Sequence, residues 1–281
     1  MNKYIINSCI EILEESFSRN LPADVQLSYF FKKNKNLGSH DRSYIADLYY
    51  GVIRNKILLE EIVGNTNLNK MILIYLLVIS GKSIKDMSVF LSNVEIEWLK
   101  EKKKNKINIS SWSTKLSLPN WIWNKLVVEY GEENSINLGS SLLAPAPLNL
   151  RINTLNNSVQ DTLEQLKSSF DSIRGKIHTT KISKLGISLP RGTSIQKHKL
   201  FLNGSIEVQE EGSQLLTYLL DSKRGHMVAD FCAGAGGKTL GISSMMRNTG
   251  RVYAFDVSDK RLSNLKKDSR DQGPLISLCK E

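Results

Sequence analysis

The stretch DFCAGAGGKT, residues 230–239, decides the fold of this chain. It joins an apolar run, HMVADFCA (226–233), which predicts a strand, to GGKTLGISSMMRN (236–248), which predicts a helix. A strand that turns directly into a helix leaves the first N–H groups of that helix free, and glycines allow a ligand to approach this backbone closely. The stretch therefore indicates a ligand-binding turn in an α/β sheet.

The residues after the turn repeat the same order. GRVYAFDVS (250–258) predicts a second strand, and DKRLSNLKKDSRDQG (259–273) predicts a second helix. Alternating strands and helices are typical of a parallel sheet with right-handed crossovers. Asp256 falls at the end of the second strand, where a carboxylate can accept hydrogen bonds from a ribose diol. A glycine turn followed by such an acid predicts a nucleoside-cofactor site.

Three ligands compete for this turn. The dinucleotide motif G-x-G-x-x-G would need its third glycine at Thr239, and the phosphate-binding motif G-x-x-x-x-G-K-[ST] would need its first at Cys232. S-adenosylmethionine needs a glycine turn and a ribose acid but no pyrophosphate cradle, so it tolerates both departures. A purely structural turn is the remaining alternative.

The sequence before residue 207 divides into two segments with different residue patterns. Residues 1–143 show helical periodicity, with Asp41 as a possible helix N-cap. Residues 144–206 predict a small α+β linker module, because two prolines break the helix and LNLRIN (148–153) then alternates like a strand. ISKLGISLP and KLFLNGSIEVQ add short predicted strands. With 207–281 as the incomplete sheet, the fold class is α + α/β: an all-α domain, a small α+β module and the first half of a Rossmann-like sheet.

The amino-acid composition limits the classes of partner and the cell compartment that we expect for this chain. The 281 residues carry a formal net charge of +10, which favours a polyanionic partner, most often nucleic acid; a general bias toward Lys, Asn and Ile is the alternative. The three cysteines lie far apart without a CxxC pair, which predicts a reducing cytoplasm. The four histidines share no metal spacing, and no apolar run reaches the roughly 18 residues of a membrane span, so neither metal nor membrane is expected.

DFCAGAGGKT resembles the cofactor loop of the bacterial ribosomal RNA cytosine-C5 methyltransferases of the Sun or Fmu family. Residues 39–56 (SHDRSYIADLYYGVIRNK) resemble its NusB-like RNA-binding helices, and residues 118–156 resemble its passage into the catalytic part. Residues 201–239 and 250–273 resemble its first two cofactor motifs. The resemblance implies a NusB-like domain over 1–143, a linker module over 144–206 and the first part of an S-adenosylmethionine-dependent domain over 207–281. It also implies RNA, above all small-subunit ribosomal RNA, as the partner.

The resemblance also implies site residues. Asp256 would bind the ribose, Arg261 would lie beside the adenosine unless it is a helix-surface cation, and the loop contacts would be Cys232, Ala233, Gly234, Ala235, Gly236, Gly237 and Lys238. Gln209 and Ser213 fall in a family segment near the cofactor, with helix capping as the alternative. Arg151 and Asn153 match an R-x-N strand that would face RNA.

No catalytic residue is assigned. The family uses two cysteine thiolates, in proline–cysteine motifs after its fourth and fifth strands, because a thiolate attacks well and also leaves well. Cys232 lies in the cofactor loop and Cys279 follows Leu278, so we expect the family cysteines to lie beyond the C-terminus. The tail GPLISLCKE (273–281) departs from the third strand of the family. We therefore expect a truncated member that is inactive alone; the alternatives are half of a split methyltransferase or a non-catalytic RNA-binding module.

Overall fold

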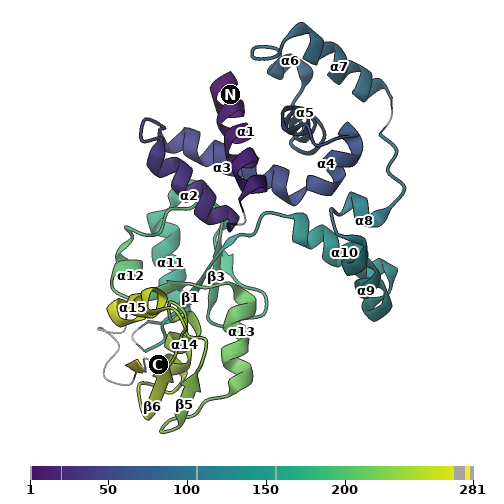
Figure 1. Cartoon of the computed structure of the whole chain (residues 1–281). Coiled ribbons are helices and arrows are strands. Elements are labelled where there is room, and N and C mark those ends of the chain that lie inside the picture. Colours follow the sequence, from purple (N-terminus) through teal and green to yellow (C-terminus); the bar gives the residue numbers. More distant parts are fainter. Residues whose placement is uncertain (1, 20, 106, 156, 269–275, 279–281) are drawn as a thin grey trace. The chain divides into compact units, whose positions relative to one another are not determined.

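A computed structural model describes residues 2–19, 21–105, 107–155, 157–268 and 276–278 of this chain. It contains two compact units, Met1–Pro145 and Ala146–Glu281, each of which is described by itself (Figure 1). The second unit holds both the small α+β module and the parallel sheet. The division of this part at residue 206 stays a prediction.

The first unit is helical, as the periodicity predicts. Its core is formed by the apolar faces of the first, third and fifth helices, with Leu13, Tyr49 and Ile72 fully buried. The elements are α1 (Lys3–Ser18), α2 (Ala23–Lys33), α3 (Ser39–Arg54), α4 (Lys56–Val63), α5 (Leu68–Ile74), the π-helix η1 (Tyr75–Ile79), α6 (Ile84–Met87), α7 (Asn93–Lys104), α8 (Trp112–Lys115), α9 (Asn120–Tyr130) and α10 (Glu132–Leu143). Among the described helices, none is by itself long and apolar enough to cross a membrane; α4 together with the Leu68–Ile79 segment passes that test only as a pair bent by 103°.

The helix boundaries in this unit show where proline, glycine and acidic residues in the sequence correctly predict the start or end of a helix and where they do not. Pro119 and Gly131 bound α9 as their residue types predict, and Gly131 has a left-handed φ of 76°. The prediction of Asp41 as an N-cap is wrong, because α3 already begins at Ser39 with Gly38 as its N-cap. Asp41 instead lies in the first turn, where its negative charge is favourable beside the helix N-terminus.

The second unit begins with an antiparallel sheet in the order β2-β3-β1-β4. Its elements are β1 (Leu148–Ile152), α11 (Val159–Ser169), the 3-10 helix η2 (Asp171–Lys176), β2 (His178–Thr179), β3 (Gly186–Leu189), α12 (Lys199–Leu202) and β4 (Ile206–Val208). Leu150 and Ile152 pack with Leu163 and Leu166 of α11 in one core. The strand predicted over KLFL is wrong: His198 accepts a hydrogen bond from the Leu200 N–H at 3.2 Å and starts the short helix α12.

A parallel sheet in the order β5-β6-β7 completes this unit. The elements are α13 (Glu211–Leu220), β5 (Met227–Asp230), α14 (Gly237–Met245), β6 (Arg251–Ala254), α15 (Asp259–Asp268) and β7 (Ile276–Leu278). The prediction that no third strand follows is therefore wrong. Ile276 pairs in register with Val252 and packs against the apolar residues on the sheet, so this short run forms a strand by pairing.

Candidate cofactor site at the glycine turn

The turn after β5 requires two of its glycines. Gly234 and Gly236 both have left-handed φ angles, 56° and 98°, a region that other residues rarely adopt. At Gly236 a Cβ atom would also lie 2.2 Å from Cδ1 of Leu265 in α15. α14 begins at the next residue, Gly237, so the turn delivers the free N–H groups of a helix N-terminus to the carboxyl end of the sheet.

Asp230, the last residue of β5, holds both ends of this turn. Its Oδ1 accepts a hydrogen bond from the Cys232 N–H at 3.2 Å, and its Oδ2 accepts one from the hydroxyl of Thr239 at 2.7 Å. Thr239 is fully buried in the first turn of α14. One carboxylate therefore ties the strand, the turn and the helix together.

Asp256 lies against the tip of the same turn. Its Oδ2 accepts from the Gly234 N–H at 2.8 Å, and its Oδ1 accepts from the Ser258 N–H at 2.9 Å. These hydrogen bonds, first that from Ser258 and then that from Gly234, lower the pKa of the Asp256 carboxyl. Desolvation opposes them with a smaller effect, and the charge of Arg261 lowers the pKa by the smallest contribution. The acid and the glycine turn thus form one site with a charged carboxylate.

The other predicted cofactor residues surround this pair. Cys232, Ala235 and Lys238 have exposed side chains, whereas Ala233 packs into the core and could meet a ligand only through its backbone. The exposed Arg261 lies near the turn: its Cζ is 3.9 Å from the position that a Cβ of Gly234 would take. The structure therefore brings the predicted loop residues, Asp256 and Arg261 together.

A hollow of about 330 Å³ lies beside the turn, on its α13 side. Lys238 and Cys232 contribute from the turn, Leu216 and Leu220 contribute from α13, and Phe231 completes the wall next to them. The ring of Phe231 stacks on Phe255, with 5.0 Å between ring centroids. In the part of the chain that the structure describes, no group of three or more His, Cys, Asp or Glu side chains is arranged to hold a metal.

Arg151 and Asn153 do not fit the prediction that they face RNA. Arg151 is 2% exposed and Asn153 is 4% exposed. The Asn153 side-chain amide donates to the Gly204 carbonyl at 3.1 Å, and the Arg151 Nε donates to Oε1 of Gln209 at 2.6 Å. The polar side of β1 is covered because α13 packs on this strand. Both residues therefore act inside the unit.

Two residues of the site were not predicted as site residues. Asp230 carries a signal in the sequence, since a carboxylate at the end of a strand can bond the turn that follows it. Gln209 was only placed in a segment near the cofactor, with capping as an alternative; in the structure the cap of α13 is Glu210, which accepts from the Ser213 N–H at 3.2 Å. Gln209 is buried and faces the turn instead: its Nε2 lies 3.7 Å from the position of a Cβ on Gly237.

Comparisons with known proteins agree with this architecture. The family model described as 16S rRNA methyltransferase RsmB/F matches residues 217–279, and the ferredoxin-like domain of RsmF/B-like methyltransferases matches residues 118–196. The probable ribosomal RNA small subunit methyltransferase B of Bacillus subtilis (strain 168) is 24% identical over 266 residues, which cover 83% of this chain and 58% of that protein. The 25S rRNA (cytosine-C(5))-methyltransferase NSUN5 of Arabidopsis thaliana is 27% identical over 144 residues, which cover 50% of this chain and 24% of that protein.

A solved structure extends the likeness to the whole fold. The crystal structure of PH0851 matches with a TM-score of 0.70 at 21% identity, over 98% of this chain and 68% of that one. The chain thus has the fold of PH0851 and spans 58% of the length of its Bacillus relative. The resemblance to the bacterial rRNA cytosine-C5 methyltransferases is confirmed, because the two family models match residues 118–196 and 217–279 and these relatives are named as rRNA methyltransferases. Over these residues the chain is similar to the RsmB/F methyltransferases.

Proposed function

We propose that this chain binds S-adenosylmethionine at the glycine turn and serves methylation of cytosine C5 in ribosomal RNA. The observation that carries the proposal is the hydrogen bond of the Gly234 N–H to Asp256, which joins a ribose-binding acid to a turn at a helix N-terminus. The residues fit this ligand, since the left-handed φ angles of Gly234 and Gly236 shape the turn at the start of α14 and Asp256 is a charged acceptor at its tip.

Each part of the site has a separate role. Asp256 would accept hydrogen bonds from the ribose hydroxyls with the lone pairs that Gly234 and Ser258 leave free. The N-terminus of α14 would receive the carboxylate of the methionine end, because the helix dipole favours negative charge there. When bound, S-adenosylmethionine supplies an electrophilic methyl group on its sulfonium.

The cofactor proposal is tested by calorimetric titration of the full chain with S-adenosylhomocysteine, ATP and NAD. All three ligands carry adenosine, but only the first lacks phosphates. We expect binding of S-adenosylhomocysteine and none of ATP or NAD at the same concentration. Tighter binding of ATP or NAD would replace the methyl-donor assignment with one of the two alternative motifs.

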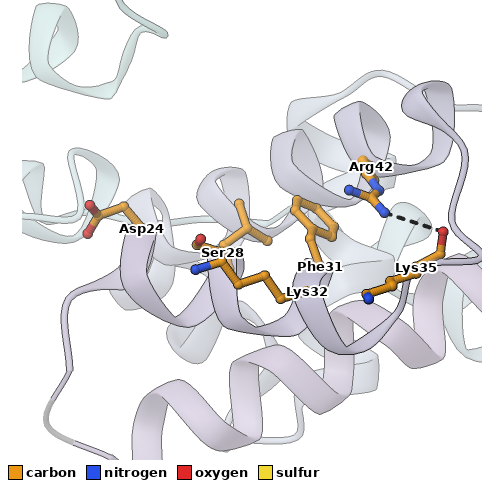
Figure 2. Close-up of a pocket in the computed structure, with 7 residues that line it drawn as sticks. Asp24, Ser28, Phe31, Lys32, Lys35 and Arg42 are labelled. Atoms are coloured by element: carbon orange, nitrogen blue, oxygen red, sulfur yellow. Dashed lines mark hydrogen bonds between the residues drawn. The ribbon is translucent and has the colours of Figure 1, made fainter.

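We propose further that the helical unit contacts RNA at a basic pocket between α2 and α3. The open pocket, about 570 Å³ in volume, is lined by Lys32, Lys35, Phe31 and Arg42 among others (Figure 2). Both lysines are exposed, while Arg42 lies 5.6 Å from the ring centroid of Phe31 and donates through Nε to the Leu37 carbonyl at 3.0 Å. Arg42 thereby stabilises the loop between α2 and α3. The two lysines can then bind phosphates beside the ring of Phe31, and a basic surface next to an aromatic ring is the combination that binds single-stranded RNA.

Charge reversal at this pocket gives a prediction. The double variant Lys32→Glu/Lys35→Glu should bind RNA about tenfold more weakly than the wild type at low salt, because two phosphate contacts become repulsive. The slope of log K against log salt should also become shallower by about 1 to 2. Fluorescence anisotropy with a labelled fragment of small-subunit ribosomal RNA measures both quantities.

The matched control is Lys103→Glu/Lys104→Glu. These two lysines end α7 in the same unit, are exposed, and give the same change in net charge. Equal losses in the two double variants would mean that only overall charge attracts the RNA, and the pocket would then have no special role.

Methyl transfer itself needs a thiolate that the described residues do not offer in a suitable place. Of their two cysteines, Cys9 is fully buried in the helical unit, and burial raises the pKa of its thiol. Cys232 is exposed, but it belongs to the turn that would hold the cofactor. We therefore expect no transfer of tritiated methyl groups to unmodified small-subunit ribosomal RNA by this chain alone. Transfer of one or more methyl groups per protein chain would contradict this part of the proposal.

A further inference from the structure

The buried Arg151 donates a hydrogen bond to the side chain of Gln209 and thereby determines the orientation of its amide. Its Nε donates to Oε1 of Gln209 at 2.6 Å, and its Nη2 is buried without a hydrogen-bond partner. Burial lowers the pKa of the guanidinium, while Glu207 and Tyr218 act in the opposite direction. A cation this deeply buried needs a specific acceptor, so the contact with Gln209 is a fixed feature of the unit.

The chemistry of arginine decides which end of the amide faces it. A guanidinium has donors only, so it must meet the oxygen of the Gln209 amide. The NH₂ end is then forced to point the other way, to 3.7 Å from the position of a Cβ on Gly237. The backbone of Gln209 is fixed as well, because its main-chain N–H donates to the Asn149 carbonyl at 3.1 Å and its main-chain carbonyl accepts from Nε2 of Gln214 at 2.8 Å.

A polar group thus points at the first residue of α14 without a partner. Gln209 is 6% exposed, and the hydrogen bonds described for its side chain use only Oε1. Gly241, one turn further along α14, lets the helix come this close: a Cβ there would lie 3.1 Å from Cγ2 of Thr217 and 3.5 Å from Nε of Arg151. Two independent features, the helix N-terminus and the NH₂ group of a side chain that is mostly buried, converge on Gly237.

We propose that the Gln209 NH₂ group donates a hydrogen bond to the carboxylate of the methionine end of the cofactor, and that Arg151 is the positioning residue that keeps this NH₂ group turned toward it. This inference rests on the proposed cofactor site and adds a specificity contact to it. A carboxylate is the ligand of choice here, since both the helix N-terminus and an amide donor favour an anionic acceptor. Arg151 is thereby placed in cofactor recognition from a strand of the small sheet.

A pair of ligands separates this contact from the rest of the site. S-adenosylhomocysteine carries the amino-acid end, whereas 5′-methylthioadenosine has the same adenosine and thioether without it. Gln209→Leu should weaken S-adenosylhomocysteine about tenfold to a hundredfold, the usual effect of losing a hydrogen bond to a charged group, and should change 5′-methylthioadenosine less than about twofold. Titration calorimetry on the full chain measures both affinities.

Gln209→Glu tests charge while preserving the fold. The glutamate keeps an oxygen for Arg151, so the buried guanidinium retains its acceptor, but it places a second carboxylate opposite that of the ligand. It should therefore weaken S-adenosylhomocysteine at least as much as Gln209→Leu does and leave 5′-methylthioadenosine unchanged. Equal losses for both ligands, or no loss for either, would overturn the proposed contact.

Arg151 is tested by two variants. Arg151→Met removes the donor and frees the amide to turn over, so S-adenosylhomocysteine should again lose more affinity than 5′-methylthioadenosine. Arg151→Lys keeps a donor and should restore most of the difference. A purely structural role would lower both affinities together and would show no such rescue.

If the wild type binds neither ligand, the proposed function fails and this inference falls with it. If the wild type binds both ligands equally tightly and the variants change both affinities alike, only this inference fails.

Discussion

Gly236→Ala should lower the free energy of unfolding of the second unit by about 2 to 6 kcal/mol. Two effects add. A residue with a Cβ at a φ of 98° costs about 1 to 3 kcal/mol of backbone strain, and forcing an extra carbon into a packed site costs about 1 to 3 kcal/mol more. The new carbon would lie 2.2 Å from Cδ1 of Leu265 and 3.2 Å from its Cβ, so a rotation of the leucine side chain cannot relieve the whole contact.

Urea denaturation followed by far-UV circular dichroism measures this loss. The tryptophans provide an internal control: all four, Trp98, Trp112, Trp121 and Trp123, lie in the helical unit, so their fluorescence reports that unit alone. Gly237→Ala is the matched variant, because its Cβ would lie 3.7 Å from Nε2 of Gln209, an ordinary contact, at a helical position. If Gly237→Ala destabilises as much as Gly236→Ala, the left-handed backbone is not what requires glycine at 236.

Asp256→Ala should reduce the affinity for S-adenosylhomocysteine about tenfold to a hundredfold. The variant removes the acceptor that we assign to the ribose and also leaves the Gly234 N–H without its partner, so the tip of the turn loses its anchor. The ribose is common to S-adenosylhomocysteine and 5′-methylthioadenosine. Both ligands should therefore lose affinity to a similar degree, in contrast to the changes expected at Gln209.

The control for Asp256→Ala is Asp171→Asn. Asp171 is exposed in η2 of the same unit and is part of neither the turn nor its neighbours. Its replacement should leave both affinities within about twofold of the wild type. An Asp256→Ala variant with unchanged affinity would remove the acid from the site, and Arg261 would then be the next residue to test beside the adenosine.

The sequence predicts the cofactor turn well because its signals are local. The φ angles of Gly234 and Gly236 and the start of α14 depend on residues within a few positions of one another. Asp256, two residues beyond the end of β6, follows from the same reasoning, since parallel strands bring their carboxyl ends to one edge.

The sequence fails where a distant segment decides the structure. β7 is too short to show a periodicity of its own, and it becomes a strand by pairing with β6 through Val252 and Ile276. Arg151 alternates with Leu150 and Ile152 as an exposed strand residue would, yet α13 covers its face of the sheet. The alternation of polar and apolar residues separates the two faces of a strand. It does not tell whether a helix will cover the polar face, as α13 does here, or whether a polar side chain such as Gln209 will bond the residue on that face.

The two hydrogen bonds of Asp230 have a consequence for how a ligand would meet this turn. Because the carboxylate fixes the Cys232 backbone and the Thr239 hydroxyl through hydrogen bonds within the chain itself, most of the ordering of the turn accompanies folding and not binding. Association then loses little conformational entropy, and it needs no slow rearrangement before the ligand can enter. The time for which a cofactor stays bound would accordingly be set by the contacts that it must break on leaving, and not by the opening of a lid.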